Sequence, residues 1–450
     1  MEPKLTDIFK AYDVRGVYPA ELDEDAARRI GWAFATFTDV PKLVMGRDMR
    51  VSSPDLCAAF AVGATAAGAR VIDVGEVSTD ALYFASGRLE VPGAMFTASH
   101  NPARYNGLKL CRAKAAPIAG DSGLTEIREL AASDEAAGAR GSGEVESADV
   151  LADYAAHCRS FVDLDVLRPL KVAIDAGNGM AGKTVPLVFD GLPFEVIPLF
   201  FELDGTFPNH PANPIEPANL ADLQDAVIAN GCDVGIAFDG DADRIFLVDE
   251  KTNLVSGSAT TALVAERILR KHPGETILYN LICSWSVPEI IEENGGKAVR
   301  TRVGHSFIKE IMAETGAIFG GEHSGHYYFR DNFRADSGMI AALFTLEAMC
   351  EHGAPLSEML SDYDRYAASG EVNSEVHDQQ GTIEQLADRY SDGKQDRTDG
   401  LTVEYEDWWF NCRASNTEPL LRLNLEARTS ALMEEKLEET LRLIRAEGGD

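Results

Sequence analysis

One serine in this chain has the neighbours of a nucleophile. An apolar run over residues 93–97 predicts a buried strand that ends just before Ser99. His100 follows directly, and Pro102 prevents the chain from continuing as a central strand. Lys109 then returns on a second apolar segment. A hydroxyl on a stiff loop, with an imidazole beside it and an ammonium nearby, suits a nucleophile or a phosphoryl carrier, the alternative being an ordinary turn serine.

Three aspartates at alternate positions form a second candidate site. Asp239, Asp241 and Asp243 lie in one turn between two apolar segments that are predicted strands. Carboxylates this close repel one another unless a cation is present, so the spacing predicts a site for one hard cation. The spacing also mimics a calcium EF-hand loop ending at Glu250, but Arg244 stands at the sixth place, where that loop needs glycine. A purely structural acidic turn is the remaining alternative.

The segment GNGMAGKT, residues 177–184, matches the phosphate-binding pattern of nucleotide hydrolases. It follows a predicted strand over residues 171–175, as that pattern requires. This supports a rival hypothesis, in which the domain hydrolyses ATP or GTP. Against it, no clear downstream apolar strand ends in a lone aspartate that would supply a second magnesium ligand. The other interpretation is a turn that packs a strand against a helix.

Three further polar loops have side chains suited to a phosphorylated sugar. His305 precedes a helical run, where a surface histidine is the ordinary interpretation. In the loop over residues 320–326, a carboxylate (Glu322) and a hydroxyl (Ser324) flanked by glycines can hydrogen-bond to vicinal sugar hydroxyls. The segment RASNTEP, residues 413–419, offers an arginine and several polar donors to a dianion, although a polar turn between strands is the alternative.

These segments resemble one enzyme family. The segment TASHNPARYNGLK, residues 97–109, closely resembles the active-site loop of the α-D-phosphohexomutases, the phosphomannomutase and phosphoglucomutase superfamily. Other segments match motifs of that family in the expected order: FKAYDVRG (9–16), DGDADR (239–244), TRVGH (301–305), GGEHSGH (320–326) and RASNTEP (413–419). The resemblance therefore covers essentially the whole chain.

The resemblance implies a role for each of these segments. Ser99 is the implied phosphoserine, and one of its oxygens completes a Mg²⁺ site on the aspartate loop. The implied metal ligands are Ser99, Asp239, Asp241 and Asp243. The implied catalytic residues are Ser99, Lys109, His305, Arg244, Arg15 and His100. The implied substrate-binding residues are Tyr12, Glu322, Ser324, His326, Arg413, Ser415, Asn416 and Thr417.

The implied reaction is a phosphoryl exchange with sugar phosphates as small-molecule partners. Phosphorylated Ser99 donates its phosphoryl group to a hexose 1- or 6-phosphate, and a hexose 1,6-bisphosphate forms as intermediate and activator. The bisphosphate turns over in the cleft and returns its other phosphate to Ser99. Lys109 and His305 are the candidates for proton transfer, and residues 413–417 hold the phosphate that is not reacting. Ala242 replaces a commoner glycine but supplies no ligand, so we expect no loss of metal.

The sugar is inferred from two motifs. FKAYDVRG resembles phosphomannomutases, and RASNTEP has asparagine where phosphoglucosamine mutases typically have glycine. We therefore expect mannose phosphate, with glucose phosphate also accepted, and phosphoglucosamine mutase as the alternative. A catalytically silent sugar-phosphate binder is a different class of hypothesis, which the intact Ser99, Lys109 and aspartates argue against.

Helical and strand-like segments alternate along the chain, which predicts an α/β layer structure. In the first part, helices are predicted over residues 22–37, 53–67 and 124–132, and the Ala, Gly and Ser-rich stretch 131–149 is a predicted linker or loop. The resemblance implies four domains around a central cleft, three related α/β units and a smaller C-terminal α+β domain. Composition breaks divide the chain into residues 1–150, 151–252, 253–368 and 369–450.

Composition excludes several classes of protein. The 450 residues have a formal net charge of −32, which argues against nucleic-acid binding because a phosphate backbone would be repelled. No apolar run is long enough to span a bilayer, and the N-terminus lacks the apolar core of a signal peptide. The seven cysteines, without a CxxC pair, indicate free thiols in a reducing cytoplasm. The charge predicts a halophilic protein, with an acidic mesophilic one as the alternative, and we expect a monomer or dimer.

Overall fold

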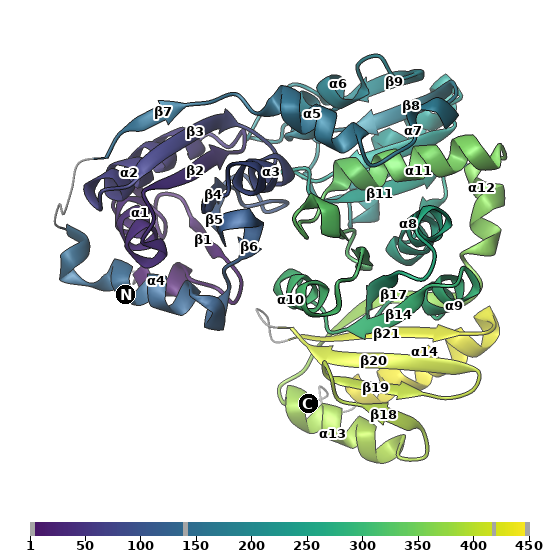
Figure 1. Ribbon diagram of the computed structural model, residues 1–450. Coiled ribbons are helices and arrows are strands. Elements are labelled where there is room, and N and C mark those ends of the chain that lie inside the picture. The colour runs from purple at the N-terminus through teal and green to yellow at the C-terminus, as the bar shows by residue number, and fades with distance from the viewer. Residues whose placement is uncertain (1–4, 138–142, 416–419, 446–450) are drawn as a thin grey trace.

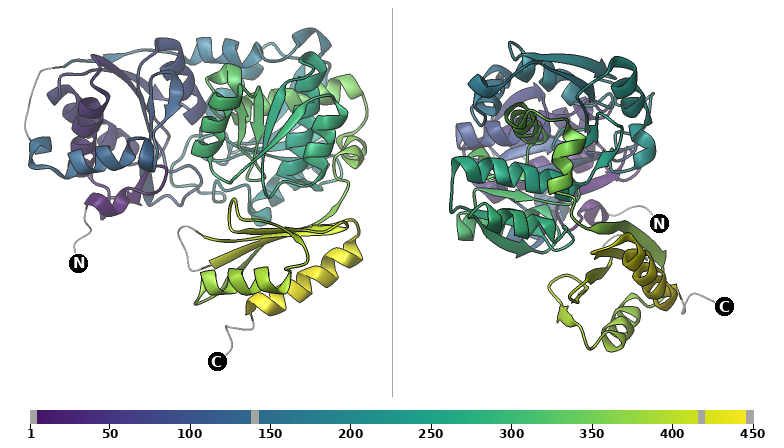
Figure 2. Two further views of the ribbon diagram at one scale, coloured as in Figure 1. Left: turned by 60° about the horizontal axis from the view of Figure 1, so that its bottom comes forward. Right: turned by 90° about the vertical axis from the view of Figure 1, so that its right-hand side faces the viewer.

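The computed structural model describes residues 5–137, 143–415 and 420–445. Four sheets, each covered by helices, succeed one another along the chain. Figure 1 shows the first sheet on the left, the second and third on the right, and the fourth at the bottom. Figure 2 shows that the fourth projects from the other three. The expected four-domain architecture, with three α/β units and a C-terminal α+β unit, is confirmed.

Domain I contains a seven-stranded sheet in the order β1-β5-β4-β2-β3-β7, with β6 paired to β5. Its strands are β1 (Val14–Val17), β2 (Lys42–Arg47), β3 (Arg70–Glu76), β4 (Gly93–Phe96), β5 (Tyr105–Arg112), β6 (Ala116–Pro117) and β7 (Val145–Ser147). Its helices are α1 (Glu24–Thr38), α2 (Ser53–Ala66), α3 (Thr79–Leu89) and α4 (Leu124–Ala132). The three predicted helices are confirmed as α1, α2 and α4.

The prediction that residues 131–149 form only a linker is wrong in one part. β7 lies in this stretch and pairs in parallel with β3 at the edge of the sheet. All three of its residues are exposed. An edge strand that buries nothing has no apolar alternation, so the sequence pattern could not reveal it.

Domains II and III repeat part of this topology. The sheet of domain II runs β12-β11-β10-β8-β9, with β8 (Leu170–Asp175), β9 (Phe194–Leu199), β10 (Val234–Phe238), β11 (Ile245–Asp249) and β12 (Leu254–Val255). That of domain III runs β14-β13-β15-β16, with β13 (Thr276–Asn280), β14 (Lys297–Thr301), β15 (Phe319–Gly321) and β16 (Tyr327–Phe329). The helices are α5 (Leu151–Arg159), α6 (Ala181–Phe189), α7 (Ala221–Asn230), α8 (Gly257–Lys271), α9 (Ser286–Glu293), α10 (His305–Thr315), α11 (Gly338–His352) and α12 (Leu356–Met359).

The repeat places three loops at equivalent positions. The orders β3-β2-β4-β5, β9-β8-β10-β11 and β14-β13-β15-β16 are the same arrangement of three parallel strands and one antiparallel strand. In each, the connection from the last parallel strand to the antiparallel strand carries predicted site residues. These connections are 97–104, 239–244 and 322–326. Loops at the carboxyl ends of parallel strands are the usual place for ligand sites in α/β sheets.

Domain IV is an antiparallel sheet, β17-β21-β20-β19-β18, with two helices on one face. Its elements are β17 (Ala367–Glu375), α13 (Gln379–Arg389), β18 (Lys394–Asp396), β19 (Leu401–Glu404), β20 (Trp408–Ala414), β21 (Leu420–Ala427) and α14 (Ser430–Arg445). Alternate residues of β20 and β21, including Phe410 and Leu423, form its apolar core. The other face is polar and contacts domain III, where the Trp285 amide donates to Glu426 Oε1 at 2.9 Å.

The first three domains share one continuous core. Buried residues of α3, β8, β10, α8 and α11 belong to a single apolar cluster. Domains I to III therefore hold their three loops on a common packed framework. Within the described residues, no helix has both the length and the apolar character needed to cross a membrane.

Candidate active site

Ser99 lies in the first of the equivalent loops, 97–104, and its side chain contacts the second, 239–244. Its side chain is buried, with 5% of the residue's surface exposed, and its backbone has a φ of 48°. This left-handed conformation is unusual for a residue other than glycine and indicates that contacts around the loop hold it. Ser99 Oγ donates to Asp239 Oδ2 at 2.7 Å, and His100 Nδ1 lies 3.3 Å from the same Oγ. Residues 140 positions apart in the chain are thus joined at the hydroxyl.

The three aspartates converge as the sequence predicted. Asp239, Asp241 and Asp243 are buried, and one oxygen of each lies within 4.8 Å of the others. Burial, followed by the neighbouring Asp243 and Asp241 carboxylates, raises the pKa of Asp239 to about 7. Asp241 Oδ1 and Asp243 Oδ1 are buried and accept no hydrogen bond within the described part of the chain. Unpaired buried carboxylate oxygens directed at one point fit a divalent cation with oxygen ligands.

The strands that flank the aspartates exclude an EF-hand, which needs helices on both sides. Ala242, at the position where the family more often has glycine, has a φ of 62°. Alanine accepts this left-handed conformation only at a cost, which accounts for the commoner glycine. The alanine methyl group does not displace the three carboxylates from one another.

Lys109 enters the same carboxylate cluster from β5. Its Nζ lies 2.8 Å from Asp241 Oδ2 and 2.5 Å from Asp243 Oδ2. Burial alone would lower the pKa of Lys109, but these two carboxylates raise it well above its ordinary value. Burial would likewise raise the pKa of Asp241, but the Lys109 ammonium lowers it. At neutral pH Lys109 is therefore a cation that can donate a proton but has no lone pair to accept one.

Two arginines contact the serine loop or the carboxylate beside it. Arg244 Nε donates to Asp239 Oδ2 at 3.0 Å, while its buried Nη2 has no hydrogen-bond partner among the described residues. A buried guanidinium donor without a partner is costly unless a ligand accepts from it, which fits an anionic group at Ser99. Arg15 Nη1 donates to the Ala98 carbonyl at 3.0 Å and to Asn101 Oδ1 at 2.6 Å. Arg15 therefore supports the loop from β1.

His326 reaches the cluster from domain III. Its Nδ1 lies 2.9 Å from Asp336 Oδ2 and 3.8 Å from Asp243 Oδ1. Lys309 Nζ, 2.8 Å from Asp336 Oδ1, neutralises that second carboxylate. Although burial opposes it, Asp243 and Asp336 raise the pKa of His326. The sequence had indicated only a phosphate or sugar contact for His326, and it had not singled out Asp336 or Lys309.

Two more of the predicted residues, Glu322 and Tyr12, meet the start of α10. Both oxygens of Glu322 accept hydrogen bonds, Oε2 from Tyr328 Oη at 2.7 Å and Oε1 from the Gly304 amide at 3.1 Å. The Glu322 carboxylate thus fixes the start of α10, where His305 is the first residue. Tyr12 of domain I meets the Phe307 ring edge-on, with centroids 6.1 Å apart. Ser324 lies half-buried in the loop beside Glu322, and nothing is described of the His305 side chain.

Domain IV adds one arginine that the sequence had indicated and one that it had not. Arg413 on β20 and Arg422 on β21 lie opposite each other in the antiparallel pair, so their side chains share the polar face. Glu371 lies 2.8 Å from Arg413 Nη2 and 3.5 Å from Arg422 Nη1. Arg422 Nη2 also donates to Ser415 Oγ at 3.4 Å. Asn416 and Thr417 lie outside the described residues.

The sequence pattern could have placed Arg422 on the polar face of its strand. The alternation in LLRLNLEA, residues 420–427, places its arginine on the same face as Asn424, away from the apolar core. Its pairing with Arg413, however, depends on the register of two strands. Both Nε atoms are buried without a hydrogen-bond partner in the part of domain IV that the structure describes. Two adjacent guanidinium groups with unused donors fit a dianion such as phosphate.

The GNGMAGKT segment does not form a nucleotide site. In a phosphate-binding loop the backbone amides point at the phosphates. Here those of Asn178, Gly179 and Met180 donate to the carbonyls of Phe200, Ala176 and Gly240. Lys183 Nζ donates to the Glu76 carbonyl of domain I at 2.8 Å. The segment therefore joins β8 to α6 and supports the aspartate loop through Gly240, which is the packing role that the sequence left open.

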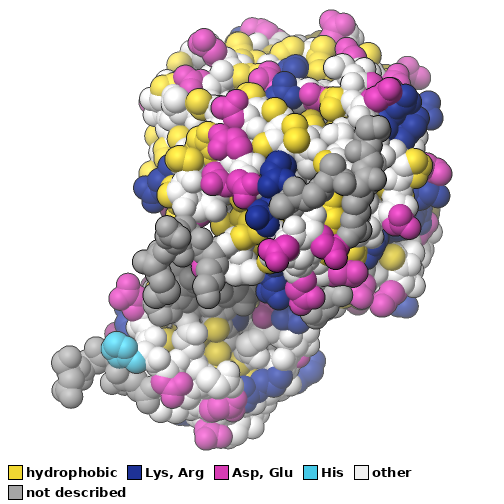
Figure 3. Space-filling view, turned by 90° about the vertical axis from the view of Figure 1, so that its left-hand side faces the viewer, with side chains coloured by type: hydrophobic (Ala, Val, Ile, Leu, Met, Phe, Trp, Pro, Cys, Tyr) yellow, Lys and Arg dark blue, Asp and Glu magenta, His cyan; other side chains and the backbone are white. Residues whose placement is uncertain are grey.

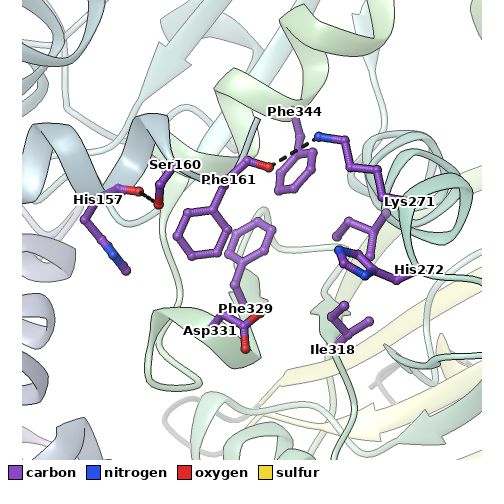
Figure 4. Close-up of a pocket in the computed structure, with 10 residues that line it drawn as sticks. His157, Ser160, Phe161, Lys271, His272, Ile318, Phe329, Asp331 and Phe344 are labelled. Atoms are coloured by element: carbon purple, nitrogen blue, oxygen red, sulfur yellow. Dashed lines mark hydrogen bonds between the residues drawn. The ribbon is translucent and has the colours of Figure 1, made fainter. Parts of the chain in front are cut away.

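A separate pocket of about 260 Å³ lies away from these residues. Figure 4 shows it between α5, α8 and α11, with the rings of Phe161, Phe329 and Phe344 turned toward one another. Its Lys271 is paired with Glu347 Oε1 at 2.7 Å. None of the predicted site residues lines this pocket.

Comparison with known proteins gives a family for the whole chain. Models of phosphoglucomutase/phosphomannomutase match residues 6–137 (alpha/beta/alpha domain I), 152–253 (domain II), 256–366 (domain III) and 371–443 (C-terminal domain). "Phosphohexose mutases" of Xanthomonas campestris pv. campestris is 42% identical over 442 residues, covering 97% of this chain and 99% of the relative. A phosphomannomutase of Escherichia coli is 41% identical over 450 residues, covering 97% and 99%.

Solved structures similar to this chain support the same family. A phosphoglucomutase/phosphomannomutase family protein of Burkholderia thailandensis has a TM-score of 0.90 at 34% identity, covering 99% of this chain and 98% of the other. An N-acetylphosphoglucosamine mutase of Aspergillus fumigatus, at 14% identity and a TM-score of 0.63, shares the fold. Fold and site thus define a four-domain isomerase of the phosphotransferase type. The chain belongs to the phosphoglucomutase/phosphomannomutase family.

Proposed function

We propose that the protein interconverts hexose 6-phosphate and hexose 1-phosphate through a phosphoserine at Ser99. One observation carries the proposal: the buried Ser99 Oγ lies 2.7 Å from Asp239 in a cluster of three converging carboxylates. A hydroxyl at a cation site can carry a phosphoryl group, because the bound cation would offset the charge of the transferring phosphate. The relatives that carry phosphohexose mutase and phosphomannomutase names support the same reaction.

The residues around Ser99 then have distinct tasks. The exchange breaks the bond between Ser99 Oγ and phosphorus and forms one between phosphorus and a sugar hydroxyl, whose proton must leave. Lys109 is held as an ammonium by two carboxylates, so it offsets negative charge rather than accepting that proton. Arg244 has a free donor for a phosphoryl oxygen. His305 stays a candidate proton acceptor, and His100, whose pKa burial lowers well below its ordinary value, is an uncharged imidazole beside Ser99.

Mg²⁺ is the cation that we propose for the carboxylate cluster. Asp239, Asp241 and Asp243, together with an oxygen of phosphorylated Ser99, would hold it. Oxygen-only donors suit this hard cation, which would supply charge stabilisation to the transferring group. A hexose 1,6-bisphosphate would be both intermediate and activator, because only a doubly phosphorylated sugar can return either of its phosphates to Ser99.

The substrate is proposed to be mannose phosphate, with glucose phosphate also accepted. The Escherichia coli relative at 41% identity is a phosphomannomutase, which supports this choice. The test is turnover of mannose 1-phosphate, glucose 1-phosphate and glucosamine 1-phosphate, side by side, with Mg²⁺ and a trace of hexose 1,6-bisphosphate. We expect mannose 1-phosphate to be converted at least as efficiently as the others. A preference for glucosamine 1-phosphate would contradict the substrate, and no turnover by folded protein would contradict the reaction.

Arg422 provides a test of the distal phosphate site. We expect the Arg422→Gln variant to raise the KM for hexose phosphates about tenfold or more, because a charge-assisted hydrogen bond to the non-reacting phosphate is lost. The value of kcat should change less, because that phosphate is bound equally in the ground and transition states. Steady-state kinetics measure both. Arg428→Gln, which removes an exposed arginine paired with Asp407, is the matched control, and an unchanged KM for Arg422→Gln would contradict the role.

We also propose the compartment and the salt conditions in which the protein works. Seven free, buried cysteines support a reducing compartment such as the cytoplasm. The net charge of −32 supports a protein adapted to high salt. Figure 3 shows acidic side chains spread over the face in view rather than gathered in one patch. Charge of one sign spread in this way destabilises the folded state by repulsion that salt screens.

We therefore expect the free energy of unfolding to be higher in about 1 M KCl than in about 0.1 M KCl. Denaturant titration with urea, which adds no ions, measures it at each salt concentration. Sucrose in place of KCl is the control, because it favours compact states without screening charge. Equal stabilisation by both solutes, or none by KCl, would contradict salt adaptation through charge.

A further inference from the structure

A buried arginine outside every predicted motif holds the loop of Ser99. Arg50 follows β2, and only 1% of its surface is exposed. Its Nη2 donates to the carbonyls of Ser99 at 2.8 Å and Asn101 at 2.6 Å. Its Nη1 donates to those of Pro102 at 3.0 Å and Tyr105 at 2.9 Å. Three carbonyls of the loop and that of Tyr105, the first residue of β5, therefore converge on a single guanidinium group.

The guanidinium group of Arg50 is also in contact with Asp48 and with a segment of domain II. Arg50 Nε donates to Asp48 Oδ2 at 3.2 Å, so all three nitrogens of the group are used. The ring of Phe207, from domain II, lies over it at 5.1 Å. Gly205 of the same segment passes so close that an added Cβ would lie 2.5 Å from Arg50 Cα. Domain II therefore closes over the arginine, and the side chain cannot adopt another rotamer without moving that segment.

The hydrogen bonds from Arg50 support a loop that has no helix or strand of its own. Residues 97–104 belong to no helix or strand, and Pro102 has no amide hydrogen to donate. Carbonyls at such a position need donors from elsewhere, and a planar guanidinium offers five in a fixed geometry. The four bonded carbonyls set the path of the chain through Ser99, whose φ of 48° needs such support.

We propose that Arg50 is a positioning residue, which fixes the Ser99 loop so that Oγ points at Asp239 and the cation site. It has no hydrogen bond to the hydroxyl or to the carboxylate cluster among the described residues, and its contacts with the loop are all to backbone carbonyls. Lysine cannot replace it, because an ammonium lacks the planar fork that reaches four carbonyls at once. The expected change in kcat rests on the proposed function. The expected change in loop conformation rests only on the contacts of Arg50.

The test compares Arg50→Lys with Arg47→Lys. Arg47, three residues earlier on β2, is partly buried, and its side chain is paired with Asp73 at 3.3 Å rather than with the loop carbonyls, so it is a control for the same substitution. We expect kcat of Arg50→Lys to fall by about 100-fold, because a displaced nucleophile loses its alignment. The KM for the hexose phosphate should stay within about threefold, because the distal site is intact. A defect that only reduced the folded fraction would lower the apparent kcat in proportion to that fraction, and the loss would disappear at temperatures where circular dichroism shows the variant fully folded.

Hydrogen exchange followed by mass spectrometry provides the second measurement. In Arg50→Lys, peptides covering residues 97–107 should exchange faster than in wild type and in Arg47→Lys, with the rest of domain I unchanged. Wild-type kcat in Arg50→Lys, or unchanged exchange in this loop, would overturn the inference. If wild-type protein shows no turnover, the proposed function fails, while the exchange result still decides whether Arg50 holds the loop.

Discussion

The Ser99→Ala variant is expected to lose turnover by at least about 10⁴-fold, because it removes the only atom that carries the phosphoryl group in the proposed reaction. No other hydroxyl takes its place among the described residues near the cluster, since Thr79 Oγ1 is already bonded to Asp241 Oδ2 at 2.6 Å. Loss of one hydroxyl from a loop held by backbone contacts should leave the fold intact. The measurement is conversion of mannose 1-phosphate with Mg²⁺ and activator.

Two controls separate chemistry from binding in this variant. Calorimetry should show glucose 1-phosphate binding to Ser99→Ala with an affinity close to that of unphosphorylated wild type, because the contacts of domains III and IV remain. Ser147→Ala, an exposed serine on β7 of the same domain, should keep full activity. Turnover by Ser99→Ala within tenfold of wild type would contradict the phosphoserine mechanism.

The Asp241→Asn variant is expected to lower turnover roughly 10²- to 10³-fold at limiting Mg²⁺. An amide oxygen is a weaker ligand than a carboxylate, so cation affinity should fall and added Mg²⁺ should restore part of the activity. The change also removes one of the two carboxylates that hold Lys109. Titration of activity with Mg²⁺, starting from protein stripped with EDTA, gives the apparent affinity directly.

The controls for this prediction are both chemical and mutational. Wild type stripped with EDTA should be inactive and should recover on addition of Mg²⁺. Asp222→Asn, an exposed residue at the start of α7, should have the wild-type Mg²⁺ dependence. An Asp241→Asn variant with unchanged Mg²⁺ affinity would contradict the assignment of this carboxylate as a ligand, and turnover that survives EDTA would contradict the need for a cation.

Parts of the fold could be predicted because their signals are local. Helical spacing of apolar residues indicated α1, helices were also predicted where α2 and α4 lie, and the apolar run before Ser99 indicated β4. The exposed edge strand β7 gave no such signal, since it is stabilised by pairing with β3 rather than by burying side chains. The GNGMAGKT match was local too, and it could not show that the amides of this segment are engaged by Phe200 and Gly240, which are distant in the sequence.

Some features of the candidate site could likewise be predicted from local sequence, and others could not. The sequence by itself indicated which loops form the candidate site, because the serine loop and the three aspartates are short motifs that can be recognised without the fold. Only the tertiary structure decided that Lys109 is a cation between two carboxylates, that Arg422 stands opposite Arg413, and that Arg50 holds the serine loop. These facts depend on burial, strand register and contacts between domains. Each arises when segments far apart in the chain meet, and no local pattern of residues records where they meet.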